Sequence, residues 1–190
     1  DKVQISNCRF ENISRRGIKL QSGSNIQMLN NTFNYCKIAL GISMENSTSG
    51  ILFDKNIIKN GDQGININSR KDKPCEVNDF KVKKNTFSKL YGVLRTSGTS
   101  SIKNGELSNN IIKSIETYVF SGKISHTQIT KNRIEDFQIK PIEKSNAAIY
   151  IWNGSNNTII SENEFFSENE NVLDVYLYIN TSNITVEKNK

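Results

Sequence analysis

A short pattern centred on asparagine recurs along the whole chain, and this repeat constrains the fold more than any other feature. Its form is apolar, any residue, apolar, two polar residues, Asn, any residue, apolar. The clearest copy covers residues 80–87 around Asn85, and another covers 26–33 around Asn31. Cys8 takes the place of the asparagine in the first copy, and the key positions are separated by 22 to 31 residues. The remaining copies are centred on Asn56, Asn110, Asn132, Asn163 and Asn189.

Each copy has the residue alternation of a β-strand. Apolar residues recur with a period of two, which is typical of strands and excludes a helical repeat. A second alternating segment follows each key position, as in 64–67 and 148–152, and turn-forming residues such as 21–25 close each coil. Short strands that stack coil upon coil form a parallel β-helix. The sequence therefore predicts an all-β, parallel β-helix solenoid of about seven coils, with residues 1–190 in a single domain.

The recurrent asparagine has a physical explanation in such a solenoid. A buried turn leaves backbone groups that need hydrogen-bond partners, and an amide side chain both donates and accepts hydrogen bonds. We expect the asparagines to form one column, bonded to the turns of their own coils and to one another.

The repeat resembles that of the pectate-lyase-like superfamily over essentially the whole chain. This superfamily includes pectin-active enzymes, alginate epimerases and bacteriophage tailspike depolymerases. The resemblance implies a right-handed β-helix, an extracellular location (secreted or carried on a virion) and polysaccharide as the partner. The resemblance does not specify one function, because the same fold hosts lyases, hydrolases, epimerases and non-catalytic spikes. Neither end of the sequence has a capping element, which predicts that the chain is an excerpt of a longer solenoid.

Composition narrows the partners and cofactors. The formal net charge is +6, and the basic residues are scattered. Such a charge fits either a solvated lysine-rich surface or attraction to a polyanion such as an acidic polysaccharide. No nucleic-acid-binding fingerprint, membrane-spanning segment or cluster of metal ligands is present. The sequence has three cysteines and one histidine, His126. These features predict no cofactor, no metal, no nucleic acid and no membrane span.

Outward positions of the second strand provide the candidate binding residues. If Ile149 and Ile151 point inward, alternation directs their neighbours outward, and the same holds one coil later. We therefore expect a solvent-facing patch of four aromatic rings that binds sugar, since exposed Trp and Tyr combine apolar area with a polar group. A subunit interface, as in a homotrimer, and packing beneath a loop are the alternatives. The patch residues are Tyr150, Trp152, Tyr176 and Tyr178.

Cleavage of a glycosidic bond requires two carboxylates. Asp174 is the leading candidate because it is expected outward beside the aromatic patch, and Glu143 and Asp136 lie in the preceding connection. Elimination on a uronic acid would instead require a basic residue. Arg95 is a further candidate for substrate binding. Alternation from Val93 directs it inward, so we expect it either to be paired inside the solenoid or to be twisted toward the outer groove. These residues favour a polysaccharide-binding and polysaccharide-degrading β-helix, a hydrolase or a lyase. The alternative function is a non-catalytic structural spike or adhesin whose aromatic residues join subunits.

Overall fold

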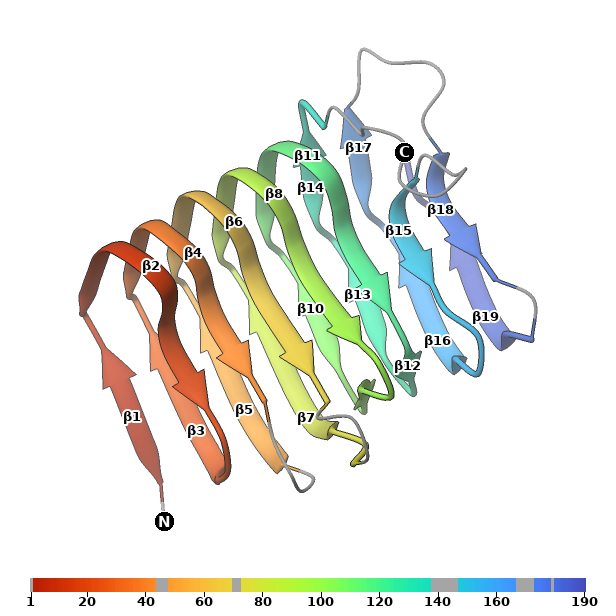
Figure 1. Cartoon of the computed structure of the whole chain (residues 1–190). Helices are drawn as coiled ribbons and strands as arrows, with labels where there is room; N and C mark the ends of the chain where they lie inside the picture. Colours follow the sequence, from red (N-terminus) through yellow and green to blue (C-terminus); the bar gives the residue numbers. More distant parts are fainter. Residues whose placement is uncertain (1, 44–47, 70–72, 138–146, 167–172, 179) are drawn as a thin grey trace.

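The computed structural model is a right-handed parallel β-helix, which confirms the predicted fold class. It has about six turns, where the sequence predicts about seven coils. The strands follow one another coil by coil from the N-terminal to the C-terminal end (Figure 1). The structure describes residues 2–43, 48–69, 73–137, 147–166, 173–178 and 180–190. All regular secondary structure within these ranges is β.

Two parallel sheets form the walls of the solenoid. We name them sheet A and sheet B. Sheet A has ten strands: β1 (Val3–Ser6), β3 (Ser24–Leu29), β5 (Thr48–Asp54), β7 (Glu76–Lys83), β9 (Ser101–Lys103), β10 (Glu106–Ser108), β12 (Ile124–Ser125), β13 (Gln128–Thr130), β16 (Asn156–Ser161) and β19 (Ser182–Glu187). Sheet B has nine: β2 (Arg9–Leu20), β4 (Thr32–Ile42), β6 (Ile57–Asn68), β8 (Thr86–Ser97), β11 (Ile111–Gly122), β14 (Arg133–Glu135), β15 (Ala147–Ile151), β17 (Glu164–Phe166) and β18 (Leu173–Leu177).

Inward side chains stack in columns, because the parallel register sets equivalent residues of successive coils side by side. The rings of Phe10 and Phe33 lie 4.8 Å apart and almost parallel, at 6°. Alternation therefore produces a continuous apolar core, as the sequence predicts. One column of sheet B consists of Phe10, Phe33, Ile58, Phe87, Ile112, Ile134 and Phe165.

The predicted asparagine column is confirmed and runs from Asn31 to Asn189. Within it, the Nδ2 atom of Asn56 donates to Oδ1 of Asn85 at 3.0 Å and to the carbonyl oxygen of Met28 at 3.0 Å. The backbone N–H of Asn56 also donates to Asn85 Oδ1, at 2.8 Å. Asn31, Asn56, Asn85, Asn110, Asn132 and Asn163 are all buried. At the first position, the backbone N–H of Cys8 donates to Asn31 Oδ1 at 2.9 Å.

Left-handed backbone conformations mark three bends of each coil. The first bend immediately precedes the asparagine column: there φ is 55° at Lys55 and 54° at Lys84. The second divides the long strands of sheet B. The third lies within the strands of sheet A or between two of them, and φ there is 54° at Asn25. The members of the first column are Asn7, Asn30, Lys55, Lys84, Asn109, Lys131, Glu162 and Lys188. Those of the second are Asn12, Tyr35, Asn60, Lys89, Ser114 and Asp136. Those of the third are Asn25, Gly50, Asp79, Asn104, His126, Asn157 and Asn183.

Candidate functional site

The outer face of the second half of sheet B gathers most of the predicted binding residues. Here Ile149 pairs with Val175 and Tyr150 with Tyr176, so the tyrosines share one outward column as predicted from their spacing. In the preceding coils this column contains Ser121, Arg95, Asn66, Gly41 and Lys19. We define the aromatic cluster as Tyr118, Tyr150, Trp152, Tyr176 and Tyr178, which pack against one another on this face.

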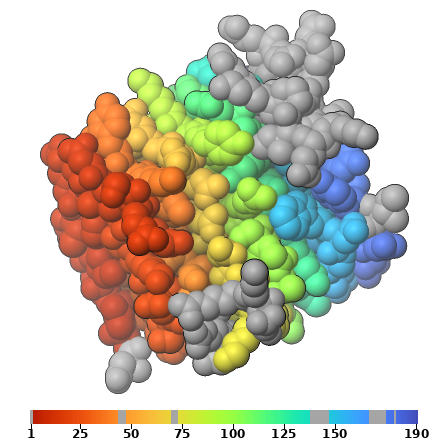
Figure 2. Space-filling view, viewed as in Figure 1, coloured from red at the N-terminus to blue at the C-terminus, as the bar shows by residue number. Residues whose placement is uncertain are grey.

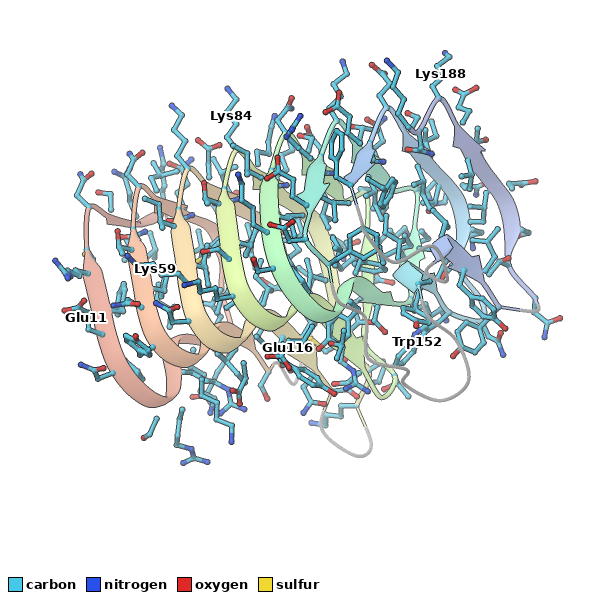
Figure 3. All side chains as sticks on the ribbon, turned by 90° about the horizontal axis from the view of Figure 1, so that it is seen from above. Glu11, Lys59, Lys84, Glu116, Trp152 and Lys188 are labelled. Carbon is cyan, nitrogen blue, oxygen red and sulfur yellow. The ribbon has the colours of Figure 1, made fainter. Side chains whose placement is uncertain are left out.

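Ring-to-ring contacts hold the aromatic cluster together. The rings of Tyr150 and Tyr176 have centroids 6.1 Å apart, and those of Tyr176 and Tyr178 are 5.2 Å apart and nearly perpendicular. Such edge-to-face geometry is favourable for aromatic pairs. Trp152, Tyr176 and Tyr178 are half-buried, so each still exposes part of its ring to solvent. Figure 3 shows Trp152 on the side of the solenoid opposite Lys84 and Lys188.

The expectation that Tyr150 faces solvent is wrong. Tyr150 points away from the core, yet only 6% of its surface is exposed. It packs with Tyr118, Ala147 and Tyr176, and its hydroxyl accepts a hydrogen bond from the backbone N–H of Ala147 at 2.9 Å. Tyr150 is therefore buried within the aromatic cluster, while Trp152, Tyr176 and Tyr178 supply the accessible surface.

Of the two orientations expected for Arg95, the inward one is wrong, and the side chain is turned toward the outer face. Leu94 and Thr96 are fully buried, and Arg95 between them lies half-buried on the outer face. Alternation from Val93 fails because Val93 and Leu94 are both buried, so two consecutive residues face the core. The guanidinium carbon of Arg95 lies 6.0 Å from the centre of the Trp152 ring, within the range of a cation–π contact. Arg95 Nε is inaccessible to solvent and has no hydrogen-bond partner.

Tyr118 links the aromatic cluster to polar residues of earlier coils. Its hydroxyl accepts a hydrogen bond from Gln63 Nε2 at 2.9 Å, and Gln63 Oε1 accepts one from Asn66 Nδ2 at 2.6 Å. The ring lies over Gly92 in the neighbouring strand, where a Cβ atom would come within 2.4 Å of it. Burial raises the pKa of Tyr118 to about 12, despite the nearby positive charge of Arg95. Its hydroxyl therefore stays protonated at neutral pH.

The sequence interpretation did not select Tyr118, Gln63 or Asn66. Tyr118 lies opposite Gly92, and Gly92 lies opposite Gln63, so Tyr118, Gly92 and Gln63 occupy one outward column. That column is hidden in the sequence because β11 has two residues between Ile115 and Tyr118 where β8 has one. Aligning the coils backwards from Ser121 would have revealed it.

The predicted carboxylates are not brought together among the described residues. Asp174 belongs to β18, but its side chain lies outside the described part of the structure, and Glu143 lies outside the described residues altogether. Asp136 is exposed at the second bend, following β14, and its backbone N–H donates to the carbonyl of Phe166 at 3.1 Å. The catalytic assignments therefore stay predictions.

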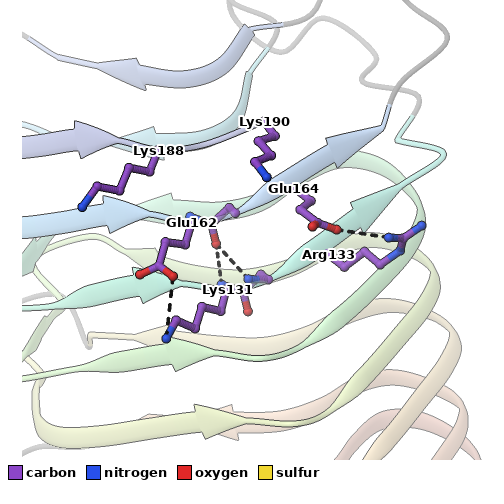
Figure 4. A pocket seen from close by; sticks show the side chains of 8 residues that line it. Lys131, Arg133, Glu162, Glu164, Lys188 and Lys190 are labelled. Atoms are coloured by element: carbon purple, nitrogen blue, oxygen red, sulfur yellow. Dashed lines mark hydrogen bonds and ion pairs between the residues drawn. The ribbon is translucent and has the colours of Figure 1, made fainter.

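A separate hollow of about 420 Å³ lies beside the C-terminal end of the asparagine column (Figure 4). Four of its six charged side chains form two ion pairs, and Lys188 and Lys190 lie beside them. Lys131 lies 3.7 Å from Glu162, and Arg133 lies 3.1 Å from Glu164. Because no aromatic ring lines the hollow, it is a weaker site for a sugar ring than the aromatic cluster.

Comparison with known proteins supports the fold and gives no information on the function. Residues 1–80 match a family model described as a right-handed β-helix region. No curated protein and no solved structure matches the chain. Within the described ranges, no three His, Cys, Asp or Glu side chains gather as metal ligands. The same ranges contain no helix of the length and apolarity needed to cross a membrane. The chain is a right-handed parallel β-helix, and the narrower resemblance to the pectate-lyase-like superfamily stays a prediction.

Proposed function

We propose that this β-helix binds polysaccharide on the outer face of sheet B and degrades it as a hydrolase or a lyase. The observation that carries the proposal is the aromatic cluster, in which half-buried Trp152, Tyr176 and Tyr178 lie beside Arg95. Apolar sugar faces stack on such rings, and adjacent polar groups hydrogen-bond to sugar hydroxyls. The location that accompanies this function is extracellular, secreted or carried on a virion.

The rings of the aromatic cluster are held in place before a ligand binds, and this preorganisation favours sugar binding. The cluster lies on strands β11, β15 and β18 and the residues directly after the last two, and the Tyr150 hydroxyl is fixed by a hydrogen bond from the backbone. Rings fixed in this way lose little conformational freedom when a ligand binds. Bond cleavage requires acidic groups beside these rings, and Asp174, Glu143 and Asp136 stay the candidates.

Removing the Trp152 ring tests the binding site. We expect Trp152→Ala to weaken oligosaccharide binding by about 1 kcal/mol or more, because the lost ring contributes beyond its buried area. Melting temperature should change little, since the ring lies outside the core. The matched control is Phe166→Ala, which removes an exposed ring that contacts Arg133 away from the aromatic cluster.

The assay begins with a panel of capsular, pectic and alginate polymers, and isothermal titration measures affinity. Release of reducing ends identifies a hydrolase, and absorbance of unsaturated products identifies a lyase. Unchanged affinity of Trp152→Ala, together with loss of an oligomer in sedimentation, would contradict the proposal. That result would instead support the non-catalytic spike or adhesin, with the aromatic cluster as the contact of a homotrimer.

A further inference from the structure

The outer face of sheet B changes chemical character along the helix axis. Its C-terminal end carries the aromatic cluster, and its N-terminal end carries basic side chains on β2 and β4. Figure 2 shows that the coils from β2 to β15 form one continuous surface. The shared column passes from Lys19 through Gly41 and Asn66 to Arg95 and then Tyr150. The face thus carries basic side chains at one end and aromatic side chains at the other, with Asn66, Arg95 and Ser121 between them.

Arg16 is positioned on this face by a glycine of the next coil. A Cβ atom at Gly41 would lie 2.3 Å from Cδ of Arg16. The arginine side chain therefore packs against Gly41, in the space that a larger side chain at position 41 would occupy. Arg16 is half-buried as a result. Lys19 is exposed opposite Gly41, and Lys37 is exposed beside Ile38, which pairs with Arg16.

These three cations are not neutralised by the described carboxylates. None of the ion pairs among the described residues involves Arg16, Lys19 or Lys37. Glu11, on the same strand as Arg16, is held by Arg9 at 2.6 Å. Asp62 lies near Lys37, and its single negative charge leaves an excess of positive charge at this end of the face.

A hollow connects the basic end to the aromatic cluster. It has a volume of about 470 Å³ and is lined by Lys37, Ile38, Asp62, Gln63 and Tyr91. Gln63 bonds to the Tyr118 hydroxyl, and the Tyr91 ring meets the Tyr118 ring edge-on at 6.3 Å. The far wall of the hollow is therefore the near edge of the aromatic cluster.

We propose that Arg16, Lys19 and Lys37 form an anion subsite, which binds a carboxylate or sulfate substituent of the same glycan chain that stacks on the aromatic cluster. This inference rests on the proposed function. From β4 to β15 there are four coil steps, roughly 19 Å at the usual strand spacing. One sugar unit cannot reach both ends, so the anion subsite contributes only to oligomers that occupy the whole face.

The test compares an anionic polymer with the same polymer after its charge has been removed. The probes are oligosaccharides of polygalacturonate, their methyl esters, and a sulfated galactan of similar length, titrated at low and high salt. We expect the parent protein to bind at least one anionic probe more tightly than the neutral ester. The preferred probe identifies the anion as carboxylate or sulfate. This preference should shrink at high salt, because exposed charges are screened.

Two variants test the residues. Lys19→Gln/Lys37→Gln changes only exposed side chains, and Arg16→Gln/Lys19→Gln removes the arginine. Each variant removes two cations and should weaken anionic binding by about fivefold, since one exposed ion contact contributes up to about that factor. Binding of the neutral ester should not change. The control Lys84→Gln/Lys188→Gln removes the same charge from the opposite side of the solenoid and should leave affinity unchanged (Figure 3).

The outcomes separate this inference from the proposed function. If Trp152→Ala weakens binding of every probe while the charge variants bind like the parent, the anion subsite is overturned and the proposed function stands. Equal losses in the charge variants and in the control would also overturn the subsite, because net charge alone would then explain them. If the parent protein binds no polysaccharide, the anion subsite and the proposed function are both overturned.

Discussion

At the residue scale, the unusual feature is how regularly side-chain-bearing residues adopt left-handed backbone conformations. Such residues recur at the same three bends of successive coils, and they include lysines, asparagines, a tyrosine and a histidine. This conformation costs an L-residue roughly 1–2 kcal/mol, and asparagine tolerates it best. The bends therefore explain part of the abundance of asparagine. Parallel stacking compensates for the strain at the remaining positions.

Lys84 offers a direct test of this strain, because its φ is 54° and its side chain is exposed. We expect Lys84→Gly to keep or raise the free energy of unfolding, since glycine adopts this conformation without a steric cost. Lys84→Val should lower it by about 1–2 kcal/mol, because a β-branched side chain is the least compatible with positive φ. Urea denaturation measures both, with Lys81→Val as a control in an ordinary strand position. A stable Lys84→Val protein would show that the bend relaxes.

At the scale of elements, neighbouring strands of sheet B fit together through small residues that leave room for large ones. β8 provides Gly92 beneath the Tyr118 ring of β11, and β4 provides Gly41 beneath Arg16 of β2. The extra residue in β11 brings Tyr118 into this position, and Thr117 of the same bulge donates a hydrogen bond to the carbonyl of Tyr91. The aromatic cluster is thus anchored by a strand irregularity, which commonly redirects side chains at functional sites.

Gly92→Ala tests this fit. The added Cβ would lie 2.4 Å from the Tyr118 ring, so the ring must move, and we expect a loss of about 1–3 kcal/mol of stability. In a Tyr118→Ala background the same substitution should cost less, which a double-mutant cycle measures. Gly41→Ala is the matched control, because the flexible Arg16 side chain can move into solvent. Additive costs of the Gly92 and Tyr118 substitutions would mean that the contact is unimportant.

At the scale of the whole molecule, the asparagine column is the feature that connects all coils. Each inner member uses both amide hydrogens and its oxygen, so every coil is bonded to the next inside the turn. A solenoid gains its stability from such contacts between adjacent coils. Disruption of one member should therefore affect the stack on both sides of it.

Asn85→Ala removes the acceptor for the backbone and side-chain N–H groups of Asn56 and the donor for the carbonyl of Phe53. Unpaired buried groups should lower the free energy of unfolding by roughly 1–3 kcal/mol. Thermal melting measures the loss, and amide hydrogen exchange at Asn56 should accelerate. Asn153→Ala, at an exposed turn, should leave both unchanged. A melting curve for Asn85→Ala that matches the parent would contradict the role of the column.

The sequence by itself determined the β-helix, its period and the identity of the asparagine column. These properties are local to each coil: alternation sets which residues face the core, and the recurrent amide satisfies the turn that contains it. The same alternation placed Tyr150 and Tyr176 in one outward column, which the register confirms.

Only the tertiary structure decided which outward residues reach solvent and which form a site. Tyr150 is only 6% exposed although alternation directs it outward, and Tyr118 and Tyr176 of the neighbouring coils pack with it. Arg95 turns outward because Val93 and Leu94 both face the core, and the bulge in β11 brings Tyr118 opposite Gly92. Exposure depends on side chains of adjacent coils and on a register shift of one residue. Neither is encoded in the alternation of a single strand.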